Sequence, residues 1–399
     1  MIFFLLFCVV VAGMNAYLWA RLVRDTRLGR AAFWSATALL LALTASLPLT
    51  LLIWARIDRS LSPALNYLAF GWLGVSFYML LLFGCWDLLR GGSWLLRRSR
   101  RSAQLSAAAA QLGDTRRVFL ARTAATGVPA AAGGIAGFGV RPALWDITTP
   151  ETAVALRRLP RALDGFSIAL LTDLHIGPLL DARFLTQLVE QTNRQRPDLI
   201  VLGGDLVDGH VHQIGSQLAP LARLRAPHGV FFVTGNHEYY SGVDDWLVFL
   251  KRLGIRVLLN ERVSVGQRGP GSRAAAASFD LAGVPDFRAG QMGGIGPDLA
   301  TTLAGRDPER ELVVLAHQPL EIGASSLAGA GLQLSGHTHG GQLYPFGALT
   351  HLVQPYIAGL HRHADTPTQI YVSCGSGFWG PPLRVLAPAE IGMLRLHSA

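Results

Sequence analysis

Residues Leu199 to Asp208 read Leu-Ile-Val-Leu-Gly-Gly-Asp-Leu-Val-Asp. The apolar run Leu199–Leu202 predicts a short strand that is buried on both faces, and the two glycines that follow mark a turn. Asp205 and Asp208 come directly after that turn. In open α/β sheets the functional groups gather at the carboxyl ends of the strands, so this stretch predicts an α/β fold with a polar site at one sheet edge.

The same sequence pattern extends from about Pro142 to the C-terminus: short apolar runs end in polar clusters and alternate with amphipathic stretches. Further buried strands are predicted at Ser167–Leu171, Val230–Val233, Leu312–Leu315 and Leu332–Ser335. Helical periodicity predicts helices at Ala182–Asn193 and Asp244–Leu253. Residues 142–399 are therefore expected to form one α/β domain.

Each predicted strand is followed by Asp, Asn or His. The clusters are Asp173-Leu-His175, Gly204-Asp-Leu-Val-Asp208, Gly235-Asn-His-Glu238, His317 and Gly336-His-Thr-His339. Carboxylate, amide and imidazole ligands without thiolates suit divalent ions such as Mn²⁺, Fe²⁺ or Zn²⁺. Because the ligands outnumber what one ion needs, they predict a pair of ions about 3.5–4 Å apart that hold a hydroxide for displacement at phosphorus.

In this order, the clusters resemble the motif pattern of calcineurin-like metallophosphoesterases, from roughly Ala162 to the C-terminus. The resemblance implies a four-layer α/β/β/α sandwich and two divalent ions, with Mn²⁺ preferred and Fe or Zn as alternatives. It implies that Asp205 bridges the ions, and that His237 is a catalytic histidine which stabilises charge or protonates the leaving oxygen. The remaining ligands would be Asp173, His175 and His339 for the first ion and Asn236, His317 and His337 for the second.

Two further residues have open roles. Asp208 is expected either to orient a ligand histidine or to cap a helix that begins near Gly209. Arg384 is expected to reach a substrate phosphate, to lie behind the ligands, or to be a surface arginine. The Gly340-Gly-Gln342 extension and the late Ser373-Cys-Gly-Ser-Gly377 segment resemble a small bacterial branch of the family, described as phosphodiesterases and in part as hydrolases of UDP-diacylglucosamine.

The N-terminal third has a different composition. The chain of 399 residues has 15% charged residues, a net charge of +9 and all 12 histidines at or after His175. Uncharged, apolar runs at Met1–Ala20, Ala31–Ala55 and Ser60–Trp86 are each long enough to cross about 30 Å of hydrocarbon. Residues 1–92 are therefore expected to form three transmembrane helices.

Arginines predict the orientation of these helices. Four of them, from Arg21 to Arg30, follow the first run, and residues 93–118 are expected to be an Arg-rich loop. The positive-inside rule places both segments in the cytoplasm. Thr115-Arg-Arg-Val-Phe-Leu120 resembles a twin-arginine signal, which implies the twin-arginine translocase as a partner during insertion. The weakly apolar residues 119–141 are expected to be a fourth span, with a flexible linker or a surface helix as alternatives.

These predictions combine into a multi-pass protein of the bacterial inner membrane whose catalytic domain lies outside the cytoplasm. We expect a phosphodiester or pyrophosphate hydrolase acting on a lipid-linked or cell-envelope substrate, such as a UDP-diacylglucosamine-like precursor. Membrane lipids are expected partners. Nucleic acid is not, because the basic clusters flank the spans instead of lining the catalytic domain. Two alternatives remain: a non-catalytic receptor or scaffold for phosphorylated ligands, and a phosphatase of soluble nucleotides.

Overall fold

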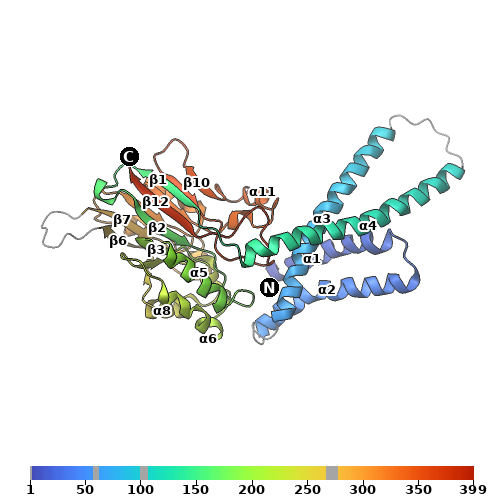
Figure 1. The fold of residues 1–399 in the computed structure, drawn as a ribbon, viewed down its shortest axis with the longest axis horizontal. Coiled ribbons are helices and arrows are strands. Elements are labelled where there is room, and N and C mark those ends of the chain that lie inside the picture. Colours follow the sequence, from blue (N-terminus) through green and yellow to red (C-terminus); the bar gives the residue numbers. More distant parts are fainter. Residues whose placement is uncertain (1, 57–62, 99–106, 267–276) are drawn as a thin grey trace. The chain divides into compact units, whose positions relative to one another are not determined.

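The computed structural model describes residues 2–56, 63–98, 107–266 and 277–399. They divide into two compact units, shown as a ribbon in Figure 1. One unit comprises Met1–Val140 with Gly380–Leu383, and the other comprises Arg141–Trp379 with Arg384–Ala399. The division after Val140 lies next to the expected start of the α/β domain at residue 142.

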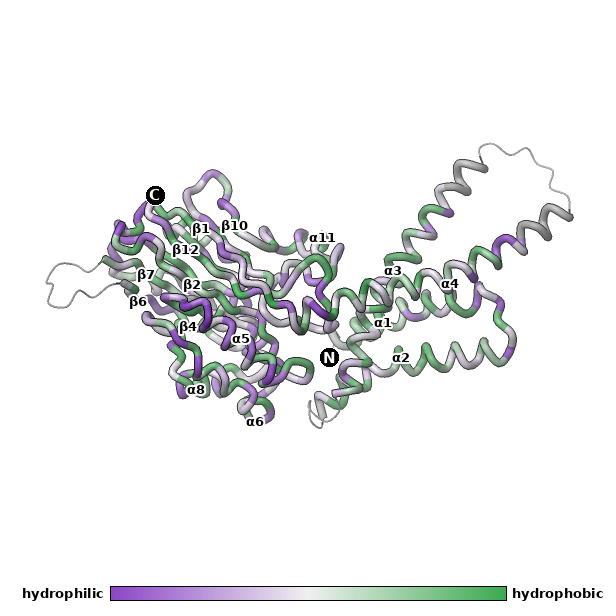
Figure 2. The backbone as a smooth tube through the Cα atoms, in the orientation of Figure 1, coloured by the Kyte–Doolittle hydropathy of each residue, from purple (hydrophilic) through white to green (hydrophobic). Residues whose placement is uncertain are grey.

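The first unit is helical. Its elements are α1 (Ile2–Trp19), the π-helical η1 (Ala20–Arg24), α2 (Arg30–Arg56), α3 (Pro63–Arg98) and α4 (Ala107–Leu144). Within the described residues, four helical stretches are long and apolar enough to span a membrane: Leu5–Arg24, Arg30–Trp54, Pro63–Gly92 and Asp114–Leu144. Figure 2 shows their mostly apolar colouring. Polar side chains pair between helices, as where Trp72 Nε1 donates to Asn15 Oδ1 at 3.1 Å.

The expected loop at residues 93–118 is mostly helical instead. Helix α3 continues to Arg98 and α4 already begins at Ala107, while residues 99–106, with Arg100 and Arg101, lie outside the described residues. The reason is helix propensity: α4 opens on four consecutive alanines, the best helix formers, and arginine is itself a good one. The twin-arginine-like residues Arg116 and Arg117 therefore belong to a helix.

The second unit contains two six-stranded sheets. The first has the order β1-β12-β2-β3-β4-β5. Its strands are β1 (Glu151–Leu156), β12 (Gly392–Ser398), β2 (Phe166–Leu171), β3 (Leu199–Leu202), β4 (Val230–Phe232) and β5 (Arg256–Val257). Strands β2 to β5 run parallel, and β12 is antiparallel to β2. The carboxyl ends of β2, β3 and β4 therefore meet at one edge.

The second sheet has the order β10-β11-β9-β8-β7-β6. Its strands are β10 (Gly359–Arg362), β11 (Gln369–Val372), β9 (Leu332–Ser335), β8 (Leu312–Leu315), β7 (Ser278–Gly283) and β6 (Glu261–Gly266). Strands β11, β9, β8 and β7 are parallel to one another. The helices of this unit are α5 (Ala182–Arg194), α6 (Val211–Ile214), α7 (Asn236–Tyr240), α8 (Val243–Arg252), α9 (Leu299–Thr302), α10 (Ile322–Leu327) and α11 (Gly347–Thr350), besides short 3₁₀ turns.

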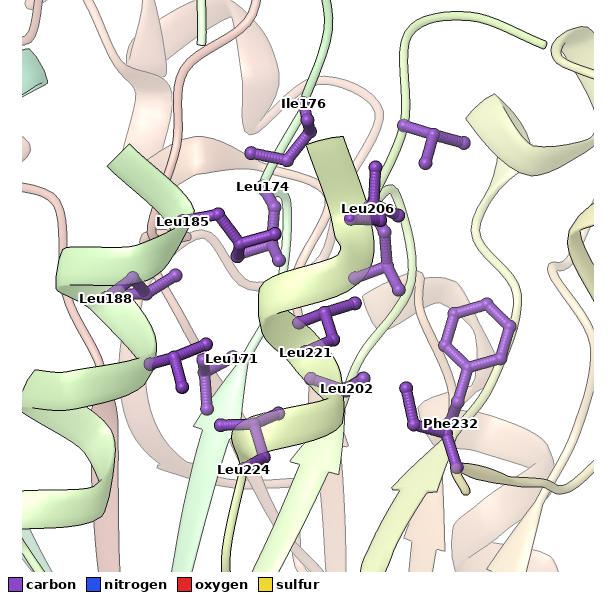
Figure 3. Packing of buried hydrophobic residues seen from close by; sticks show 14 of the residues in the cluster. Leu171, Leu174, Ile176, Leu185, Leu188, Leu202, Leu206, Leu221, Leu224 and Phe232 are labelled. Carbon is purple, nitrogen blue, oxygen red and sulfur yellow. The ribbon is translucent and has the colours of Figure 1, made fainter. Parts of the chain in front are cut away.

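Strand alternation builds the layers. On β2, Ile168 and Leu170 belong to a core shared with residues of the second sheet, whereas Ala169 and Leu171 belong to a core shared with helices. Figure 3 shows the core that the first sheet shares with helices, where Leu171 of β2 lies among side chains of α5 and of the 3₁₀ turn η3 (Gly215–Arg223). On the outer face of the other sheet, Val314 packs with α9. The four-layer sandwich expected from the sequence is confirmed.

Helix α5 shows how sequence fixes one of these layers. The side chain of Asp181 caps its first turn by accepting hydrogen bonds from the backbone N–H groups of Arg183 and Phe184. Phe184, Leu185 and Leu188 recur at helical spacing and are buried against the sheet. Each such burial contributes about 1.5–3 kcal/mol, so the helix is held mainly by its apolar face.

Candidate metal centre

The expected site residues all lie in the second unit, directly after parallel strands. Asp173 and His175 follow β2, Asp205 and Asp208 follow β3, and Asn236 and His237 begin α7 after β4. His317 follows β8, and His337 and His339 follow β9. Both sheets thus deliver side chains to one region, because the carboxyl ends of their parallel strands meet there.

Five of these residues have an unusual backbone. Asp173, His175, Asp205, His337 and His339 adopt φ angles between 47° and 71°, in the left-handed region that only glycine enters without strain. Backbone hydrogen bonds hold two of them, from Asp173 N to Gly204 O at 3.0 Å and from His175 N to Asp205 O at 3.1 Å. Strain of about 1–3 kcal/mol per residue persists only where the surroundings enforce it, and it clusters at functional sites.

One group of ligand atoms comes from Asp173, His175 and His339, whose nearest polar atoms lie within 4.8 Å of one another. His175 Nε2 is 3.1 Å from His339 Nε2, and His339 Nε2 is 3.6 Å from Asp173 Oδ1. All three side chains are buried. Two imidazole nitrogens and a carboxylate oxygen that face one another are a donor set for a divalent cation.

A second group comes from Asp205, His317 and His337. The His317 ring is oriented by its Nδ1, which lies 2.8 Å from the carbonyl oxygen of Gly203 and donates to it. Its Nε2 lies 3.1 Å from Asp205 Oδ2, and in the neutral ring this nitrogen carries the lone pair that a cation would take. A carbonyl that fixes the tautomer of a histidine in this way is the usual support of a metal ligand.

The residues present fit a metal pair. Within the described part of the chain, Asn236 Oδ1 is buried and makes no hydrogen bond, and His317 Nε2 is buried with only an ion-pair contact to Asp205. A buried polar atom without a partner costs about 1–3 kcal/mol, so such atoms call for an explanation. Bound cations would satisfy both. Asn236 adds an amide oxygen beside the second group, because the backbone N–H of its neighbour His237 donates to Asp205 Oδ1 at 2.8 Å.

Asp208 joins two histidines. Its Oδ1 lies 3.2 Å from Nδ1 of His175 and 2.6 Å from Nδ1 of His237. Of its two expected roles, the structure has the geometry of the histidine-orienting one. The helix-capping alternative is wrong, because α6 begins only at Val211 and its N-cap is His210.

Charge around His237 favours its protonated form. Burial lowers the pKa of His237, but Asp205 and Asp208 outweigh it and raise that pKa to about 9. Burial by itself would raise the pKa of the Asp208 carboxyl, but the nearby His175 and His237 hold that pKa well below the usual range. An imidazolium beside a carboxylate is thus available to donate a proton near neutral pH.

The sequence assigned no role to Glu238, which lies behind the site. Its buried carboxylate accepts hydrogen bonds from the backbone N–H groups of Asp205, Leu206 and Gly235, at 3.0, 2.7 and 2.7 Å. It thereby fixes the two loops that carry Asp205 and Asn236 relative to each other. The only sequence signal was its position in Gly235-Asn-His-Glu238.

Arg384 does not reach outward to a substrate. Its guanidinium is fully buried and donates to backbone carbonyl oxygens, including those of Gly377 at 2.9 Å, Ala387 at 2.9 Å and Cys374 at 2.7 Å. A further bond of 3.2 Å to His339 O ties it to the loop of a candidate ligand. The expectation of phosphate contact is therefore wrong. The expectation that it lies behind the ligands matches the geometry.

Comparisons with known proteins identify the family of this domain. Residues 166–341 match the family described as calcineurin-like phosphoesterase. An uncharacterized metallophosphoesterase of Helicobacter pylori is 43% identical over 247 residues, which are 62% of this chain and 63% of the relative. An Aquifex aeolicus protein with the same description is 32% identical over 61% of this chain and 90% of its own length.

A relative with membrane helices also matches. A Danio rerio protein described as a transmembrane protein with metallophosphoesterase domain is 31% identical over 96% of this chain and 86% of its own length. The matched segment spans less than two thirds of the Helicobacter relative, at 63%. Because the Danio rerio relative matches nearly the whole chain and residues 166–341 match the family itself, the chain belongs to the calcineurin-like phosphoesterase family.

Proposed function

We propose that this protein hydrolyses a phosphodiester or pyrophosphate bond with the help of two divalent metal ions, preferably Mn²⁺. Asp205 is the proposed bridging ligand and His237 the proposed acid. The other ligands in the proposal are Asp173, His175 and His339 for one ion and Asn236, His317 and His337 for the other.

One observation carries the proposal: two groups of carboxylate and imidazole ligand atoms stand beside a buried amide oxygen, Asn236 Oδ1, that makes no hydrogen bond in the described chain. Two divalent ions, when bound, polarise phosphoryl oxygens and lower the pKa of coordinated water. His237, held by Asp208, donates a proton to the leaving oxygen. Glu238 keeps the loops of Asp205 and Asn236 in register.

We propose a lipid-linked or cell-envelope phosphate as the substrate, such as a UDP-diacylglucosamine-like precursor. The support is that the catalytic unit follows four apolar helical stretches on one chain. A soluble nucleotide would need no such attachment. A receptor that binds phosphorylated ligands without turnover would need no acid, whereas His237 is oriented by Asp208 for proton transfer.

We further propose that the catalytic unit lies outside the cytoplasm of the bacterial inner membrane. Within the helical unit, Arg27 pairs with Asp114 at 2.7 Å, and Arg122 Nε donates to Thr26 O at 3.0 Å. These contacts support a position of the α1–α2 connection and the beginning of α4 on the same side of the membrane. Both segments are rich in arginine, which favours the cytoplasm. Activity of a C-terminal reporter that works only in the cytoplasm would contradict this orientation.

The proposed activity is tested with the purified full-length protein, Mn²⁺ and bis-p-nitrophenyl phosphate. We expect turnover by the wild type, a loss of about 10²–10⁴-fold in kcat for His237→Ala, and no activity above background for Asp205→Asn. Asp244→Asn, an exposed carboxylate of α8, is the matched control and keeps wild-type turnover. Stoichiometric metal binding without turnover of diester or lipid substrates would favour the receptor instead.

A further inference from the structure

The catalytic unit exposes a cluster of large apolar side chains. Leu349, Leu352, Val353, Trp379 and Leu386 are between 54% and 79% exposed, and we call them the apolar rim. Single exposed apolar residues are normal on soluble proteins, whereas contiguous groups mark binding surfaces. From Gly340 to Leu360, the stretch that carries Leu349, Leu352 and Val353, the sequence contains no Asp, Glu, Lys or Arg.

Hydrogen bonds join the three segments of the rim. Tyr344 N donates to Val385 O at 3.1 Å and Val385 N to Gln342 O at 2.8 Å, in a short parallel bridge. The side chain of Gln342 then pairs with the backbone of Trp379, donating to its carbonyl at 2.9 Å and accepting from its N–H at 3.0 Å. The bridge is formed by Leu343, and α11, which carries Leu349, begins four residues later at Gly347; Leu352 and Val353 lie in the turn after α11. The segments that carry the rim are therefore joined to one another.

The rim adjoins the candidate metal centre. The ring of Trp379 lies 6.0 Å from the ring of His237, centroid to centroid. His339, a candidate ligand, stands three residues before Gln342. The Trp379 end of the rim therefore lies beside the proposed acid.

Three features of the chain point to the lipid bilayer as what covers the rim. The chain carries helices apolar enough to cross a membrane. Only residues 145–150 separate the end of α4 from the start of β1, which limits the distance between them to about 20 Å. The rim also has the composition of a membrane-interface segment, since it combines leucine and valine with a tryptophan and lacks charge.

We propose that the apolar rim inserts into the lipid–water interface, and so holds the catalytic centre at the level of phosphate groups on the bilayer surface. Insertion of this kind buries apolar side chains about 5–10 Å into the boundary of headgroups and acyl chains. The insertion itself is independent of catalysis. The consequence for substrate choice rests on the proposed function: it selects phosphates presented by lipids over phosphates free in solution.

The test measures how deeply spin labels are immersed in the full-length protein, reconstituted in phosphatidylethanolamine–phosphatidylglycerol nanodiscs. Labels are attached to Leu352→Cys and, in a second variant, to Leu386→Cys, after the three native cysteines, Cys8, Cys85 and Cys374, have been replaced by alanine. Leu327→Cys is the matched control, because Leu327 is also a leucine of this unit and is 93% exposed. Collision with dissolved oxygen reports lipid, and collision with a water-soluble nickel chelate reports water.

We expect both rim labels to be immersed by about 5–10 Å and shielded from the chelate, with the Leu327 label fully accessible to it. Rim labels as accessible to the chelate as the control would overturn the proposal. The proposal would also be overturned if the rim labels were shielded from both oxygen and the chelate and their spectra were broadened by a neighbouring label. A second copy of the chain would then cover the rim. Diester hydrolysis is measured on the same samples: immersed labels without turnover contradict only the proposed function, and turnover with exposed labels contradicts only the insertion.

Discussion

Arg384 shows how a buried cation organises the centre without touching a substrate. Burial lowers its pKa to about 10, which still leaves the guanidinium protonated at neutral pH. Its planar group has donors enough for the carbonyl oxygens of several loop residues at once, among them His339, Cys374 and Gly377. Lysine has a single nitrogen and cannot reach the same set.

Replacing Arg384 by lysine should therefore destabilise the protein. Several buried carbonyls would lose their donor, and each costs about 1–3 kcal/mol, so we expect a clearly lower thermal midpoint and weaker Mn²⁺ binding. Arg183→Lys is the control, because that side chain is 92% exposed. A variant with unchanged stability but a raised KM would show instead that Arg384 binds the substrate.

At the level of single residues, the sequence predicted which side chains meet but not what holds them. Asp173, Asp205 and His317 could be picked out because each follows a buried apolar run, and parallel strands end at a common edge. The role of Glu238 could not be found in this way. It depends on three backbone N–H groups in loops up to 33 residues away, which no local pattern reveals.

At the level of elements, Asp280 fastens the edge of the second sheet. This fully buried residue of β7 has Oδ1 3.3 Å from Arg262 Nη1 of β6 and 3.1 Å from Arg310 Nη1, just before β8. Arg306 Nε stands 3.7 Å from its other oxygen. One carboxylate thus lies among three arginines and offsets part of their mutual repulsion.

Asp280→Ala should lower the free energy of unfolding by about 3–5 kcal/mol, because it leaves these partly buried arginines without their counter-charge. Thermal unfolding of the full-length protein in detergent measures the loss. Asp245→Ala, in the exposed first turn of α8, should cost less than about 1 kcal/mol. Equal effects of the two substitutions would mean that the Asp280 cluster contributes little to stability.

Among the strands, β2, β3, β4, β8 and β9 could be predicted, whereas the others, including the largely buried β7 and β11, could not. Strands β2, β3 and β8 are continuous apolar runs, so they stand out in the sequence. Strand β6 alternates between buried and half-exposed positions. Strands β1 and β12 pair although Glu151 and Met393 lie at opposite ends of the catalytic unit, and a pairing over such a separation leaves no local signal.

At the scale of the whole molecule, metal should stabilise the folded protein. Ions that bind only the folded state raise the free energy of unfolding by an amount that grows with the ion concentration, about 2.7 kcal/mol when that concentration is a hundredfold above Kd. Stripping with a chelator should therefore lower the thermal midpoint, and Mn²⁺ should restore it. Asp205→Asn, which lacks the proposed bridge, should respond much less. A midpoint that ignores both chelator and Mn²⁺ would contradict a metal centre in this fold.

The most direct measurement is electron paramagnetic resonance of the Mn²⁺-loaded, full-length protein together with its metal content. We expect two ions per chain and the spectrum of an exchange-coupled pair, because Asp205 is the proposed shared ligand. The coupling should vanish in Asp205→Asn along with diester turnover. One ion per chain, or the spectrum of isolated ions in a protein that still hydrolyses the diester, would contradict the two-metal account.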